Sequence, residues 1–243
     1  NKGKIIITDD NEIVDVPAIK NDINEKKLIL LYACIGLFID LKAQYSYWTT
    51  LIIKINDKTY RTNSIASIFG RDHNKAYIGR FQNVFEIDNF LEIIIGHSDY
   101  VFYDRYLDQP LEFCVKEESV GYNKLLDYKW ELYRILKDQG IQPNDLVAID
   151  NIVYNANEIG NYIWAMVLSY HGILLNPNWI AEAGTKNRND EPWEQKAIDR
   201  GKEKANKLEI NRENVLQYRL EFRLLYEEVD KSWRDINPFI DFK

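Results

Sequence analysis

The stretch that decides the fold class is Leu51-Ile-Ile-Lys-Ile55, followed by Asn56-Asp57-Lys58 and then by Thr59-Tyr-Arg-Thr62. β-branched and aromatic residues are enriched on both sides of a short polar segment that contains turn-forming Asn and Asp. This arrangement is typical of two antiparallel strands joined by a tight turn. The segment therefore predicts a β-hairpin.

The beginning of the chain repeats this pattern. Two β-branched runs, Ile5 to Ile7 and Ile13 to Val16, flank the turn-forming residues Asp9-Asp10-Asn11, and they predict another hairpin. Between the two hairpins, Asn24 is placed to cap a helix whose apolar residues recur at helical spacing as far as Phe38. The first part of the chain is thus expected to be mixed and rich in strands.

Two further apolar runs, Asp88 to Ile95 and Leu111 to Val115, fit either strands or short helices, because periodicity does not separate such short segments. After residue 118 the pattern changes to apolar residues at steps of three and four, with capping residues between the runs. Helices are predicted over 122–136, 145–153, 164–170, 176–183 and from 190, and a last helix is predicted to be capped by Asn211.

The overall expectation is an α+β protein in which a strand-rich part, residues 1–118, packs on a mostly helical part, residues 119–243. The change in composition near residue 118 is the candidate boundary. No flexible linker or internal repeat forces a division, so the two parts can also form one continuous domain.

Composition limits the classes of function. The chain has 243 residues with 46% hydrophobic content, enough for a sizeable core, and a net charge of −7. No long-range field therefore attracts it to nucleic acid or anionic lipid, although a local basic surface is compatible with this average. Cys34 and Cys114 lie in apolar runs, as buried free thiols do, and no apolar run reaches the length of a membrane span.

The second half of the chain contains a distinctive series of polar, small and turn-forming residues. The series resembles the bacterial polymorphic toxin type 44 domain, a C-terminal module of secreted effectors. The resemblance covers residues 158 to about 205 and rests on Glu158, Gly160, Asn161, Tyr162, Gly172, Ala183-Gly184, Asp190, Glu191, Pro192, Gln195, Ile198 and Gly201.

This resemblance implies an antibacterial effector toxin that is secreted or delivered into a target cell, with a cognate immunity protein as partner. It also implies a hydrolase of the nuclease type, acting on RNA or another phosphodiester. Without the resemblance, a cytoplasmic location is the alternative.

Three residues of the second half are the candidate catalytic set. Glu158 and Asn161 are three residues apart, so on a helix they share a face where a carboxylate and an amide can polarise a substrate. His171 follows near the end of the same segment and is suited to proton transfer near neutral pH. In the alternative interpretation Asn161 caps a helix, Glu158 is solvated, and the dipole of the helix favours a cationic His171.

Other polar residues suggest subsidiary sites. Arg71, His73 and Arg80 could bind an anionic substrate from a loop. His97, between Gly96 and Ser98, is expected at the end of a strand, where site residues often gather.

Asp190 and Glu191 supply oxygen ligands suited to a divalent metal ion, although acidic residues at the start of a helix are also explained by the helix dipole. No motif for a nucleotide, a zinc ion or another cofactor is present, so no cofactor is expected apart from such a metal ion.

Two other functions fit the composition. One is a peptidoglycan hydrolase toxin, since aromatic faces stack on sugars and carboxylates supply acid and base. The other is a non-enzymatic immunity or adaptor protein, because Tyr and Trp are favoured binding anchors.

Overall fold

The structure is a computed structural model that describes residues 5–7, 12–14, 50–55, 58–64, 67, 84–119, 124–142, 145–173 and 192–236. Its strands are β1 Ile5–Ile7, β2 Glu12–Val14, β3 Leu51–Ile55, β4 Lys58–Thr62, β5 Val84–Glu86, β6 Leu146–Ile149 and β7 Ile152–Tyr154. Its helices are η3 Asp88–Phe90, α3 Leu91–Tyr100, η4 Val101–Arg105, α4 Leu111–Glu118, α5 Tyr128–Ile135, η5 Lys137–Gln139, α6 Ala156–Tyr170, α8 Pro192–Ala205 and α9 Arg212–Ile236. The predicted α+β class, with a helical C-terminal part, is confirmed.

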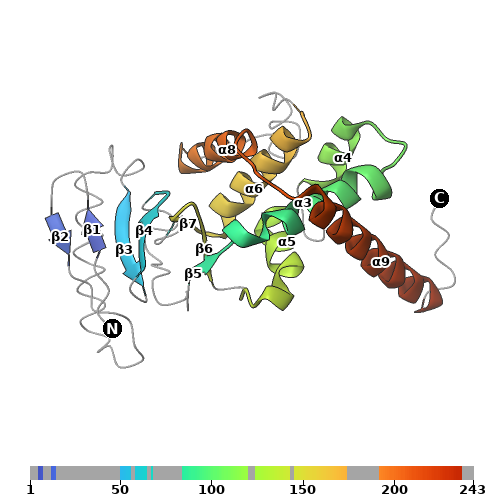
Figure 1. Ribbon diagram of the computed structural model, residues 1–243, viewed down its shortest axis with the longest axis horizontal. Coiled ribbons are helices and arrows are strands. Elements are labelled where there is room, and N and C mark those ends of the chain that lie inside the picture. Colours follow the sequence, from blue (N-terminus) through green and yellow to red (C-terminus); the bar gives the residue numbers. More distant parts are fainter. Residues whose placement is uncertain are drawn as a thin grey trace.

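The strands form one mixed sheet in the order β2-β1-β3-β4-β7-β6-β5 (Figure 1). Both predicted hairpins are confirmed: Ile6 pairs with Ile13 between β1 and β2, and Ile53 pairs with Tyr60 between β3 and β4. β4 pairs in parallel with β7, and β5 pairs in parallel with β6. The sheet therefore joins strands from before and after residue 118.

The predicted helix over residues 145–153 is wrong, because this segment forms the antiparallel strands β6 and β7. All four residues of β6 are buried, and a strand covered on both faces has a continuous apolar run that resembles a buried helix. The turn between the strands is formed by Asp150 and Asn151, which have φ angles of 51° and 59°. Two left-handed residues are what a tight hairpin turn requires, and Asp and Asn accept this conformation readily.

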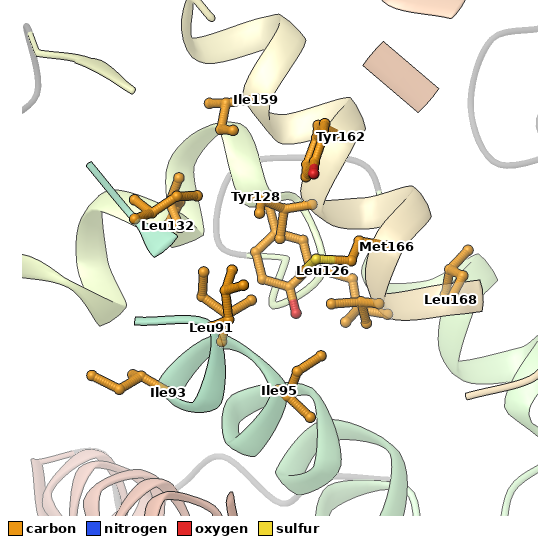
Figure 2. Packing of buried hydrophobic residues seen from close by; sticks show 14 of the residues in the cluster. Leu91, Ile93, Ile95, Leu126, Tyr128, Leu132, Ile159, Tyr162, Met166 and Leu168 are labelled. Carbon is orange, nitrogen blue, oxygen red and sulfur yellow. The ribbon is translucent and has the colours of Figure 1, made fainter. Parts of the chain in front are cut away.

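The helices pack in pairs beside the sheet: α6 against α8, α3 against α9, and α5 against α6. Figure 2 shows the core between α3, α5 and α6, where Ile95, Leu132 and Met166 are buried among other apolar side chains. The ambiguous runs 88–95 and 111–115 are helical, in η3 with α3 and in α4. None of the described helices is long and apolar enough to cross a membrane.

Several predicted helices are present with shifted ends. The helix predicted over 122–136 begins only at Tyr128, and α6 extends the prediction for 164–170 back to Ala156. α9 begins where Asn211 was predicted to cap it, and the Asn211 side chain accepts a hydrogen bond from the backbone of Glu213 at 2.9 Å. The helices predicted near residues 24–38 and 176–183 lie outside the described residues.

Candidate functional site

The predicted site residue Glu158 lies in the first turn of α6. The Asn155 side chain accepts hydrogen bonds from the backbone of Asn157 and Glu158, both at 3.0 Å, and Glu158 Oε2 accepts one from the backbone of Asn155 at 3.1 Å. These reciprocal bonds form a capping box. The interpretation that Asn161 caps this helix is therefore wrong, because Asn161 lies inside α6 and Asn155 is the cap.

The second oxygen of Glu158 is held from the end of β4. Oε1 accepts hydrogen bonds from Ser64 Oγ at 2.7 Å and Asn63 Nδ2 at 2.9 Å. Glu158 is fully buried, which corrects the interpretation that it is solvated. Burial raises the pKa of its carboxyl group, and the hydrogen bonds from Ser64, Asn63, Ser67 and Asn155 oppose this rise.

Helix α8 completes this cluster through Asn63. The Asn63 side-chain amide donates to the backbone carbonyl of Trp193 at 3.0 Å and accepts from Arg200 Nη1 at 2.8 Å. The backbone carbonyl of Asn63 accepts from Lys196 Nζ at 2.8 Å. We call Asn63, Ser64, Asn155, Glu158 and Arg200 the Glu158 cluster. It joins the end of β4, the start of α6 and one face of α8.

Two glycines of the toxin-like series also lie where α6 meets other helices. A methyl group on Gly201 would lie 2.1 Å from the carbonyl oxygen of Tyr162, and one on Gly160 would lie 2.7 Å from the backbone nitrogen of Lys129. Only glycine permits these approaches of α8 and α5 to α6. In this structure Glu158, Gly160, Tyr162 and Gly201 thus have a shared structural role in packing α6.

His171 lies at the opposite end of α6 from Glu158. Thirteen residues separate them along the chain, which corresponds to about 20 Å along a helix. The half-buried Asn161 lies between them on α6. The structure therefore does not bring the three predicted catalytic residues together in one site.

The His171 ring is fixed by two hydroxyl groups. Ser98 Oγ donates to the carbonyl of Ile95 at 2.8 Å, so it accepts from His171 Nε2, which lies 2.9 Å away. In a neutral imidazole the other nitrogen is then an acceptor, and Nδ1 accepts from the Tyr103 hydroxyl at 3.1 Å. The hydrogen bonds fit one tautomer of His171, protonated on Nε2.

Burial, with a smaller contribution from the charge of Arg212, lowers the pKa of His171 to about 3. The imidazole is therefore neutral at physiological pH. The interpretation that the helix dipole keeps His171 cationic is wrong, because loss of hydration in this site outweighs the attraction of the helix end.

Asp99 lies beside this histidine, with its Oδ1 atom 3.6 Å from His171 Nε2. Oδ1 is buried and has no hydrogen-bond partner among the described residues. Burial raises the pKa of Asp99 to about 6, against the opposing charges of Arg219 and Arg212, and the charge of Asp104 adds to the rise. The carboxyl group consequently changes charge close to neutral pH.

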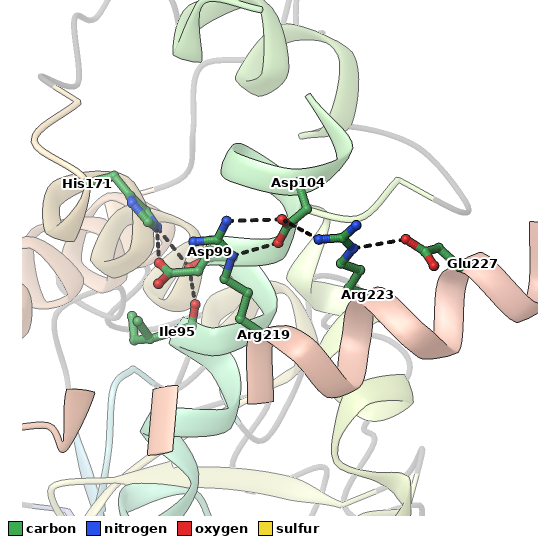
Figure 3. Close-up of polar contacts among 8 residues, drawn as sticks. Ile95, Asp99, Asp104, His171, Arg219, Arg223 and Glu227 are labelled. Atoms are coloured by element: carbon green, nitrogen blue, oxygen red, sulfur yellow. Dashed lines mark hydrogen bonds and ion pairs between the residues drawn. The ribbon is translucent and has the colours of Figure 1, made fainter. Parts of the chain in front are cut away.

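Two arginines of α9 border the same region. Arg219 donates to both carboxylate oxygens of Asp104, at 2.6 and 3.0 Å (Figure 3). It also lies over the ring of Tyr103. Arg212 lies over the ring of Tyr170, donates to its hydroxyl group and is exposed. The guanidinium group of Arg212 has five N–H donors, and it can bind an anion while it keeps the contact with Tyr170.

Tyr103 and Asp104 lie in η4, a single π-helical turn that follows α3 directly. Such turns are rare and recur at functional sites, where they redirect side chains. We call Asp99, Tyr103, His171 and Arg212 the Asp99 site. It combines a carboxyl group that titrates near neutrality, a neutral imidazole, and an exposed cation.

The neighbouring Ser98 does not form a serine hydrolase triad with these residues. Its hydroxyl hydrogen is donated to a helix carbonyl, and its side chain is fully buried. In addition, His171 presents the same nitrogen to Ser98 and Asp99, whereas a triad uses the two nitrogens for the two partners.

His97 was predicted at the end of a strand, which is wrong: it lies inside α3 and is fully buried. Its Nε2 atom is 3.2 Å from Glu131 Oε1. Burial acts to raise the pKa of Glu131, but the adjacent His97, together with Arg134 and Tyr226, holds it below its usual value. This pair joins α3, α5 and α9 in the core.

The remaining predicted site residues, Arg71, His73, Arg80, Asp190 and Glu191, lie outside the described residues. Within the part of the chain that the structure describes, no three His, Cys, Asp or Glu residues are grouped so as to hold a metal ion.

The comparisons with known proteins return no relative. No protein-family model, no curated protein and no solved structure matches the chain.

Sequence reasoning identified His171 but missed Asp99, Tyr103 and Arg212. Asp99 lies two residues after His97 in the chain, and no local pattern indicates that α3 brings it to the end of α6.

Proposed function

We propose that the chain is a hydrolase that cleaves RNA or another phosphodiester, and that it acts as an antibacterial effector toxin. The observation that supports the chemistry is the environment of Asp99. This residue has a pKa of about 6, and it lies beside a neutral His171 and within the field of two arginines. The effector role rests on the resemblance of residues 158 to about 205 to a toxin domain.

A carboxyl group with a pKa near neutrality is suited to general acid–base catalysis, because enough of the base form is present and its basicity is raised. Above pH 6 the ionised Asp99 accepts a proton from the attacking hydroxyl group, which comes from water or from the 2′-hydroxyl group of RNA. The attacking oxygen bonds to phosphorus, the bond from phosphorus to the leaving oxygen breaks, and the leaving oxygen takes a proton from water. The exposed Arg212 binds the phosphate oxygens and stabilises the negative charge that develops on them.

His171 contributes a fixed, neutral side chain beside Asp99 in this mechanism. Its ring is held by Ser98 and Tyr103, and its side chain is only 2% exposed. Because the ring is neutral, it does not lower the pKa of Asp99 as a cation would. The high basicity of Asp99 thus depends on a histidine that stays uncharged.

The direct test is cleavage of RNA and of a simple phosphodiester, bis(p-nitrophenyl) phosphate, by the purified chain. Asp99→Asn should lower the rate about 10²–10⁴-fold while the protein remains folded. Asp108→Asn is the matched control, because Asp108 is exposed on the same segment of the chain and should leave the rate unchanged. Equal rates for the wild type and Asp99→Asn would contradict the proposal.

The effector role is tested by expression in a susceptible bacterium, either in the cytoplasm or exported to the periplasm. A nuclease should stop growth from the cytoplasm, and Asp99→Asn should abolish the effect. Toxicity confined to the periplasm, with lysis of the wall, would instead indicate a peptidoglycan hydrolase. Normal growth in both compartments would refute the toxin proposal.

A further inference from the structure

Helix α9 has apolar residues on two opposite faces. On one face, Val215 and Phe222 are buried where α9 packs against α3. On the other face, Leu216, Leu220 and Leu224 are 53%, 57% and 63% exposed. Residues four apart lie one above another on a helix, so these three leucines form a continuous stripe. We call them the leucine stripe.

Charged residues on the two sides of the leucine stripe have opposite signs. At 100° per residue, Arg212, Arg219 and Arg223 fall on one side of it, together with Glu227, which pairs with Arg223 at 2.9 Å, so this side has a net positive charge. On the other side fall Gln217, Glu221 and Glu228, of which the two glutamates are exposed. An apolar stripe with a basic border and an acidic border is typical of helices that pair with another helix.

We propose that the leucine stripe is the contact surface of a homodimer in which α9 of one copy lies parallel to α9 of a second copy. In a parallel pair the twofold axis runs along the helices, so the basic border of each copy meets the acidic border of the other. An antiparallel pair would place like charges opposite each other. The separation of charge therefore selects both the partner and its direction.

Within the part of the chain that the structure describes, the leucine stripe is exposed. α9 runs away from the helices of the core toward the C-terminus (Figure 1). By helical spacing, the leucine stripe lies on the face opposite the buried Val215 and Phe222. Three leucines cover much less than the roughly 800 Å² per partner of a standard interface. The dimer is accordingly weak, with a dissociation constant on the order of 10–1,000 μM.

Sedimentation velocity of the full chain between about 5 and 1,000 μM tests the association. A rise in the average mass is expected, and Leu220→Asp should abolish it, because a carboxylate would be buried at the contact. Leu107→Asp is the matched control: Leu107 is 71% exposed but lies outside α9, so its replacement should leave the association unchanged. A wild-type chain that is monomeric at all concentrations would overturn the proposal.

Cysteine cross-linking tests the direction of the pair. With Cys34 replaced by serine and the buried Cys114 retained, Leu216→Cys alone and Leu224→Cys alone should each form a disulfide-linked dimer. In an antiparallel pair the cross-link would instead require both variants mixed together.

Charge reversal supplies a second test of the same point. Arg223→Glu and Glu228→Arg should each weaken the association, and the double variant should restore it. Circular dichroism confirms that each variant keeps its helices. Single reversals without effect would overturn the parallel arrangement.

Discussion

The Oδ1 atom of Asp99 lies 3.6 Å from Nε2 of His171, yet the two groups do not behave as a salt bridge. In a salt bridge the pKa of the acid falls and that of the histidine rises. Here burial raises the pKa of Asp99 to about 6 and lowers that of His171 to about 3. Both groups are shifted toward their uncharged forms, which indicates that loss of hydration dominates this site.

The stability of the protein should therefore depend on the protonation of His171. The unfolded chain binds a proton at this residue below about pH 6.5, whereas the folded protein does so only near pH 3. Acid thus favours the unfolded state, and stability falls as the pH decreases below 6.5, by up to about 1.4 kcal/mol per pH unit. In urea unfolding between pH 4.5 and 7.5, His171→Gln should reduce this dependence. Parallel curves for the two proteins would contradict the assignment.

Asp99 should have the opposite effect. Its pKa is higher in the folded protein than in the unfolded chain, so its ionisation destabilises the fold as the pH rises from about 4 through 6. Asp99→Asn should be more stable than the wild type at pH 7.5, on the order of 1–2 kcal/mol, and nearly equal to it at pH 4. Asp104→Asn should be less stable, because it weakens the pair with Arg219. Thermal unfolding at the two pH values measures both effects.

The Glu158 cluster should contribute to folding. Glu158→Ala leaves the buried groups of Asn63 and Ser64 without their acceptor, and each such loss costs about 1–3 kcal/mol. The melting temperature should fall strongly, whereas the exposed Glu203→Ala should change it little. A Glu158→Ala protein with the melting temperature of the wild type would show that these hydrogen bonds do not hold the cluster together.

Gly201 should be one of the least replaceable residues of α8. In Gly201→Ala the new methyl group would lie 2.1 Å from the carbonyl oxygen of Tyr162, so α8 must move away from α6. Overpacking of this kind costs typically about 1–3 kcal/mol. Gly140→Ala serves as a comparison, because its methyl group meets open space and only its φ of 94° is unfavourable. Denaturant unfolding should rank Gly201→Ala as the less stable variant.

The sequence predicted those elements whose signals are local. The β3–β4 hairpin follows from alternation around a short turn, and Asn211 marks the start of α9. The β6–β7 hairpin was missed because a fully buried strand has no alternation. Asp150-Asn151 between two β-branched runs was the available signal for its turn.

The candidate site was less accessible to sequence reasoning because it depends on contacts between distant segments. Glu158 is buried only because β4 and α8 close over the start of α6. Likewise, the pKa of Asp99 depends on its burial and on the charges of two arginines of α9, Arg219 and Arg212. Neither environment leaves a pattern in the sequence next to the residue itself.

The pH dependence of kcat/KM for phosphodiester cleavage tests the central claim most directly. If the ionised Asp99 is the base, the rate should rise with pH and reach half of its maximum near pH 6, and Asp99→Asn should remove this rise together with most of the activity. A rate that is independent of pH between 5 and 8, or a rise that persists unchanged in Asp99→Asn, would contradict it.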